Sequence, residues 1–93
     1  MAELLALVKQ ALSIVATATI KDSELTMLIN AAKLDLERQG IDVVTTDALV
    51  QCAIVMFVKA NFGNVDIKEK ELAQKTYSLL CTNLSLSSEY QEG

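Results

Sequence analysis

Residues 49–62 read Leu-Val-Gln-Cys-Ala-Ile-Val-Met-Phe-Val-Lys-Ala-Asn-Phe. Placed on a helix at about 100° per residue, the apolar side chains of this segment point in nearly every direction, so that almost no face suits water. The rest of the chain must therefore enclose this helix, and any apolar surface left open is expected to be covered by another copy or by a partner. The segment contains Lys59 and falls short of the roughly 20 residues that cross a bilayer, so we do not expect a membrane span.

The composition favours one compact helical domain. The chain has 93 residues, of which 52% are hydrophobic and 4% are aromatic, with three glycines and no proline. It is too apolar for a disordered chain and too poor in turn residues for a fold made only of strands. We therefore expect an all-α fold, a compact bundle of about four helices that forms a single domain over residues 1–84, followed by a polar C-terminal tail over residues 85–93.

Hydrophobic periodicity and end signals place the first two helices. The first is expected over residues 2–16 as an ordinary amphipathic helix, with Lys9 on the side that faces water. Asp22 or Ser23 supplies a side-chain oxygen suited to the N-cap of the second helix. This helix is expected to end at Gly40, which readily adopts the left-handed conformation found after helices.

The same signals place the last two helices. A cap within residues 45–47 is expected to start the third helix, which stops near Phe62, and Asp66 is expected to cap the fourth. The apolar arc expected on the fourth helix comprises Leu72, Ala73, Thr76, Tyr77, Leu79, Leu80 and Leu84.

The second helix carries two apolar stripes. The first stripe comprises Leu25, Leu28, Ile29, Ala32 and Leu36. The second comprises Met27, Ala31 and Leu34, and lies roughly opposite on the helix, with polar residues on both flanks. A helix with two apolar faces needs two partners. Either both stripes pack inside the chain, between the first and third helices, or the second stripe packs against a neighbouring subunit.

The charge balance argues against tight binding to nucleic acid. The net charge is -4, and the eight basic residues are dispersed among twelve acidic ones. Non-specific binding to DNA depends on clustered Lys and Arg side chains that displace counterions from phosphates. Contact with DNA, if it occurs, is expected to be contact without specific binding.

No arrangement of residues indicates catalysis, a metal or a cofactor. The chain has no histidine, no glycine-rich phosphate loop and no nucleophile with a base nearby. The closest carboxylate pairs are two residues apart, and such side chains diverge on a helix. Cys52 and Cys81 are expected to be small buried hydrophobes. A disulfide between their helices is geometrically conceivable but disfavoured in the cytoplasm, where the lack of a signal-peptide pattern places synthesis.

Three segments occur in a distinctive order. Asp-Ser-Glu-Leu at residues 22–25 precedes Leu-Ile-Asn-Ala-Ala-Lys at 28–33, and after the break at Gly40 comes Ala-Ile-Val-Met-Phe-Val-Lys-Ala-Asn-Phe-Gly at 53–63. Together they resemble the head-tail connector family of tailed bacteriophages, whose members are also described as head-completion adaptors or small DNA-packaging proteins. The resemblance spans about residues 8–90, and the ending at 84–90 is similar to that of members from phages and prophages.

The resemblance implies a structural role without catalysis at the head-tail junction of a virion. Connector subunits form a ring below the portal protein, extend the DNA channel and present a platform for the next adaptor or tail-completion protein. DNA would pass through such a ring without specific binding, and no membrane is involved. For this chain, the expected contacts between subunits are Met27, Ala31, Leu34 and Arg38, and the expected docking tail acts through Leu86 and Tyr90.

A second class of function fits the same residues. A small cytoplasmic helical regulator that binds a protein partner as a dimer would also carry a helix with two apolar stripes. The two classes differ in mass and in their partners, because a connector should associate with heads that bear a portal.

Overall fold

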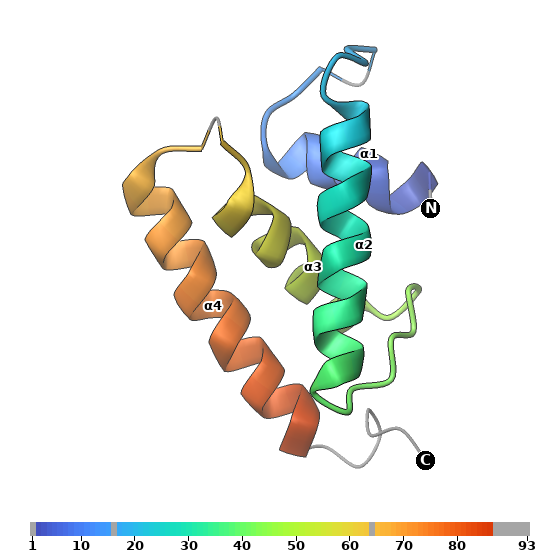
Figure 1. Ribbon diagram of the computed structural model, residues 1–93, viewed down its shortest axis with the longest axis vertical. Helices are drawn as coiled ribbons and strands as arrows, with labels where there is room; N and C mark the ends of the chain where they lie inside the picture. Colours follow the sequence, from blue (N-terminus) through green and yellow to red (C-terminus); the bar gives the residue numbers. More distant parts are fainter. Residues whose placement is uncertain (1, 16, 64, 87–93) are drawn as a thin grey trace.

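The computed structural model describes residues 2–15, 17–63 and 65–86 and shows four α-helices (Figure 1). They are α1 (Ala2–Ala11), α2 (Asp22–Arg38), α3 (Ala48–Asn61) and α4 (Ile67–Leu86). The all-α bundle expected from composition and periodicity is confirmed.

Helix α3 lies at the centre of the bundle and packs against the other three helices (Figure 1). Its fully buried side chains are Val50, Ala53, Ile54 and Val58. The buried side chains that α2 and α4 contribute are Leu25, Ile29, Ala32, Leu36, Ala73, Tyr77, Cys81 and Leu84. Burying one aliphatic side chain of this kind is worth about 1.5–3 kcal/mol, so the hydrophobic segment at residues 49–62 provides much of the driving force for folding.

The enclosure of α3 is incomplete on the side next to α1. Leu49 is 48% exposed, and Cys52, which the sequence predicts to be buried, is exposed. A shallow apolar groove follows this side of α3 and includes Leu7, Ala48 and Val55. The prediction for Cys52 is wrong because α1 covers only part of α3, whereas Cys81 is buried as predicted.

Two helices end in the same left-handed turn. In α2, Gly40 has a φ of 79°, and the amide of Ile41 donates to the carbonyl of Leu36 at 3.1 Å, which is the Schellman arrangement. In α1, Ser13 has a φ of 60°, and the amide of Ile14 donates to the carbonyl of Lys9 at 2.8 Å. The prediction for Gly40 is confirmed, but the first helix ends at Ala11 and not at residue 16.

Aspartates cap two of the helices as predicted. The carboxylate of Asp47 accepts hydrogen bonds from the amides of Leu49 at 2.9 Å and Val50 at 3.2 Å. The carboxylate of Asp66 accepts one from the amide of Lys68 at 3.2 Å. Such caps satisfy amides that the first turn of a helix leaves without partners.

The start of α2 is built differently from the prediction. Its N-cap is Lys21, which makes no side-chain capping bond, and Asp22 is already helical. The Asp22 carboxylate instead lies 2.6 Å from the Nζ atom of Lys9, and the same ammonium donates to the carbonyl of Ala18 at 2.7 Å. Lys9 is therefore buried, contrary to its predicted place on the wet side of α1, because this ion pair ties α1 to the start of α2.

Candidate assembly surfaces

One side of α2 faces solvent with apolar side chains. Met27 is 65% exposed and Leu34 is 62% exposed, whereas the stripe on the opposite side, apart from the half-buried Leu28, is buried against α1 and α3. Ala31 lies between them and is half-buried. The alternative in which both stripes pack inside the chain is therefore wrong for Met27 and Leu34. We call the exposed set Met27, Ala31 and Leu34 the α2 row.

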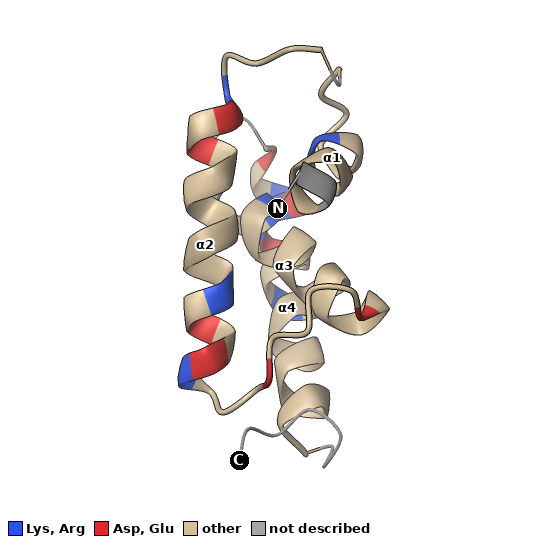
Figure 2. Cartoon of the chain, turned by 90° about the vertical axis from the view of Figure 1, so that its right-hand side faces the viewer, with Lys and Arg blue, Asp and Glu red and all other residues tan. Residues whose placement is uncertain are grey.

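Charged residues lie near both ends of the α2 row, but none lies in the N-terminal half of the row. Between Glu24 and Lys33 the helix carries no charged residue, and the middle of α2 is correspondingly tan in Figure 2. Arg38 lies at the C-terminal end of the row, with its side chain 81% exposed and its guanidinium 4.0 Å from the Asp35 carboxylate of its own helix. An arginine so placed presents N–H donors to the surroundings of the row.

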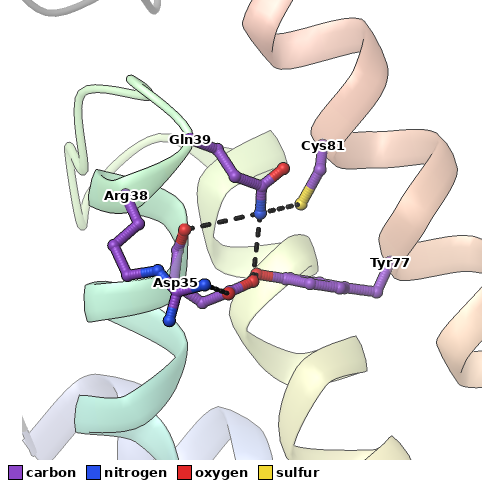
Figure 3. A network of polar contacts seen from close by, with 5 residues as sticks. All are labelled: Asp35, Arg38, Gln39, Tyr77 and Cys81. Carbon is purple, nitrogen blue, oxygen red and sulfur yellow. Dashed lines mark hydrogen bonds and ion pairs between the residues drawn. The ribbon is translucent and has the colours of Figure 1, made fainter.

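A polar network holds the C-terminal half of α2 against α4. The Tyr77 hydroxyl donates a hydrogen bond to the Asp35 carboxylate at 2.5 Å. The Gln39 side-chain amide donates to the same carboxylate at 3.0 Å and to the Cys81 Sγ at 3.5 Å (Figure 3). The Tyr77 ring also meets the ring of Phe57 on α3 edge to face, with centroids 5.3 Å apart.

Tyr77 and Cys81 are the members of this network whose pKa values are shifted, and both are neutral at neutral pH. Burial, together with the hydrogen bond to Asp35, raises the pKa of the Tyr77 phenol far above its ordinary value. Burial also raises the pKa of the Cys81 thiol. Both groups therefore act as neutral donors or acceptors that fix α2 relative to α4 and so fix the position of the α2 row on the bundle. Sequence reasoning missed this network, although a buried tyrosine signals that its hydroxyl has a partner.

A second apolar row lies on the outer side of α4. Leu72, Leu79 and Leu86 are 66%, 67% and 77% exposed and follow one another at intervals of seven residues. The sequence assigns Leu72 and Leu79 to the buried arc of this helix, and that assignment is wrong. The bundle covers a narrower arc, centred on Ala73, Tyr77, Cys81 and Leu84. We call Leu72 and Leu79 the α4 row, which Leu86 continues at the helix end.

The expected docking tail falls partly within α4. The helix runs through Ser85 to Leu86, two residues into the segment that the sequence assigns to the tail. Leu86 is therefore an exposed helical residue. Tyr90 lies outside the described residues.

The described residues present exposed apolar surfaces, the α2 row and the α4 row. Among residues 2–15, 17–63 and 65–86, no group of three or more acidic, cysteine or histidine side chains is placed to hold a metal ion. Within the same ranges, no helix is both long and apolar enough to cross a membrane.

Comparison with protein families decides what kind of protein presents these surfaces. A family model described as "phage connector protein" matches residues 4–91, nearly the whole chain. The chain belongs to the phage connector protein family. The resemblance found in the segments at 22–33 and 53–63 is thereby confirmed. Neither the curated proteins nor the solved structures include a significant match to the connector.

Family membership gives the connector a structural role in a phage particle, among the proteins of the head and tail. It favours association over catalysis as the task of the exposed rows. Of the two classes of function that the sequence suggests, the family match supports the phage connector and not the small helical regulator.

Proposed function

We propose that this connector assembles as a ring below the portal protein, where it extends the DNA channel and helps to join head to tail. The observation that carries the proposal is the exposed α2 row on a chain of the connector family. A ring needs each subunit to bury a surface against its neighbour, and Met27 and Leu34 are the large apolar side chains that α2 leaves uncovered.

The α2 row suits the contact between subunits of a ring. Ring closure uses a heterologous contact, in which one surface of a subunit meets a different surface of the next. In that contact Met27, Ala31 and Leu34 supply the apolar centre. Arg38 at the end of the row supplies a charged hydrogen bond across the seam, and such bonds are about twice as strong as neutral ones.

The charge of the subunit fits a channel through which DNA slides. The connector carries a net charge of -4, and a ring of such subunits multiplies that charge around the axis. Carboxylates repel phosphates and release no counterions from DNA, so the ring would guide DNA without holding it.

The C-terminal end is proposed to dock on the portal protein or on the next adaptor or tail-completion protein. Leu86 is exposed at the end of α4, and Tyr90 follows four residues later. An apolar and an aromatic side chain on a polar terminal segment can anchor that segment on a partner protein. Removing residues 86–93, which takes away both Leu86 and Tyr90, should spare the helical fold but lower binding to portal-bearing heads. Full binding by the truncated connector would refute the docking role.

The ring proposal is tested by binding to heads with and without a portal. Purified connector should sediment with portal-bearing heads in several copies per head and restore their ability to accept tails, but should not sediment with heads that lack the portal. Leu34→Asp, which changes an exposed residue of the α2 row, should lose this binding while its circular dichroism stays helical. Equal binding to both kinds of head would contradict the proposal.

A further inference from the structure

The α2 row and the α4 row share one spacing. Met27 and Leu34 are seven residues apart on α2, and Leu72 and Leu79 are seven residues apart on α4. Seven residues are nearly two helical turns, or about 10.5 Å along the axis. Each row is therefore a short seam of the kind through which two helices pack side by side.

The two rows lie on different sides of the subunit. Figure 1 shows α3 between α2 and α4, and both of these helices direct their buried faces toward α3. The rows are on the opposite faces of their helices, so they point away from the core and away from each other. They cannot cover each other within one chain. Two different apolar surfaces on two sides of a subunit are what a head-to-tail contact requires.

The charges beside the two rows are mixed in sign. At about 100° per residue, Lys68 and Lys75 lie within about 60° of Leu72 on one flank of the α4 row, and Glu69 lies about 60° away on the other flank. On α2, Glu37 lies about 80° from Met27 on one flank, whereas Arg38 and Glu24 lie toward the other.

These charges complement each other when the two rows pack antiparallel. With Leu34 beside Leu72, Lys68 meets Glu37 on one flank of the seam and Glu69 meets Arg38 on the other. Two α4 rows packed antiparallel would instead bring Lys75 against Lys75 of the second copy.

We infer that the α2 row of one connector subunit packs antiparallel against the α4 row of the next, with Lys68 facing Glu37 and Glu69 facing Arg38 across the seam. This inference rests on the proposed ring and identifies its second surface. The occupant of the α4 row is therefore a second copy of this chain.

The test uses two variants that each keep one of the two surfaces. Leu34→Asp has a damaged α2 row and an intact α4 row, and Leu79→Asp has the reverse. Each variant alone should stay monomeric at concentrations where the wild type associates. Mixed one to one, they should form a discrete heterodimer through the single intact seam and stop there. Light scattering coupled to size-exclusion chromatography reads the masses. Ile67→Asp is the matched control, because Ile67 is 71% exposed on the same helix but lies off the row.

Three results would overturn the pairing. One is self-association of L79D alone, since it would mean that α2 rows pair with each other. Another is a mixture that stays monomeric under conditions where the wild type associates. The third is a loss of association in I67D as large as that in L79D.

Cross-linking extends the test to an assembly that forms only on heads. Equal amounts of unlabelled and ¹⁵N-labelled wild-type connector are bound to portal-bearing heads and treated with a zero-length carbodiimide, which joins lysines to carboxylates. Links of mixed isotope between the α4 lysines and the α2 glutamates are expected. Intermolecular links that never join α2 to α4, or none at all on heads that carry the connector, would overturn the pairing while leaving the ring proposal intact. Failure of the wild type to bind portal-bearing heads would instead overturn the proposed function.

Discussion

Leu34 is the position where a change should separate assembly from folding. It is the larger of the two aliphatic side chains in the α2 row, of which Ala31 is the other, and it is 62% exposed. Complete burial of a leucine is worth about 1.5–3 kcal/mol, so burial of the part still exposed is worth about 1–2 kcal/mol at each seam. Leu34→Ala should therefore weaken each contact between subunits about 5–30-fold, since 1.4 kcal/mol corresponds to a factor of ten.

Leu34→Asp should have a much larger effect than Leu34→Ala. The new carboxylate would have to leave water when the seam closes, at a cost of several kcal/mol unless it finds a partner. Added to the lost burial, this weakens each contact by more than about 100-fold. The fold should change little, because substitutions at exposed positions usually alter the free energy of unfolding by about 0.5 kcal/mol.

The assay compares wild type, L34A, L34D and the control I67D at matched concentrations. Sedimentation velocity reports assembly, alone and on portal-bearing heads, and a thermal melt followed by circular dichroism reports stability. We expect association to fall in the order wild type, L34A, L34D, with nearly equal melting temperatures. Association of L34D as strong as that of the wild type would refute the assignment of the α2 row to the seam.

The remaining predictions concern the folded subunit. Asp22→Ala leaves the buried Lys9 ammonium without its carboxylate and should lower the free energy of unfolding by about 3 kcal/mol, more than Lys9→Met, as measured in urea; equal losses would contradict the buried charge. The pKa of Tyr77 is raised above its ordinary value of 10.0, so the unfolded state ionises first and stability should fall as pH rises above about 10, by up to about 1.4 kcal/mol per unit. Tyr77→Phe should make this alkaline loss of stability shallower. An unchanged slope of the free energy of unfolding against pH would contradict the raised pKa of Tyr77. A thiol reagent should modify the exposed Cys52 quickly and the buried Cys81 only on unfolding, whereas two fast thiols would argue against the packing of α4.

Features of the fold that depend on neighbouring residues were predictable. The all-round apolar pattern at residues 49–62 indicates the central helix, and Asp47, Asp66 and Gly40 mark helix ends through bonds and dihedral angles within a few residues. Each of these signals needs no knowledge of the rest of the chain.

The end of α1 was not predictable from periodicity. The apolar pattern continues past Ala11 through Leu12 and Ile14, both of which pack against the core. The helix nevertheless ends, because Ser13 adopts a positive φ, a conformation that the sequence signals reliably only for glycine or asparagine.

Contacts between distant residues were also beyond the sequence. Asp35 and Tyr77 are 42 residues apart, yet the Tyr77 hydroxyl donates a hydrogen bond to the Asp35 carboxylate. Lys9 is a charged residue at a position that reads as exposed, and only the approach of Asp22 explains its burial. Such pairings follow from how the helices cross.

Of the two candidate assembly surfaces, the α2 row was predictable from the sequence and the α4 row was not. Two stripes separated by polar residues on α2 indicate a helix with two partners, and the structure leaves the second stripe exposed at Met27 and Leu34. On α4, Leu72 and Leu79 belong to one broad apolar arc in the sequence, and periodicity does not say how much of an arc the bundle covers. The α4 row therefore emerged only from the packing of α4 on α3.

Electron microscopy of portal-bearing heads incubated with the connector tests the ring most directly. We expect averaged images to show a closed ring with a central hole below the portal, in line with its channel, that is absent without the connector and absent with L34D. Connector density that is isolated on the head surface, or a portal whose lower face stays bare at saturating connector, would contradict the ring.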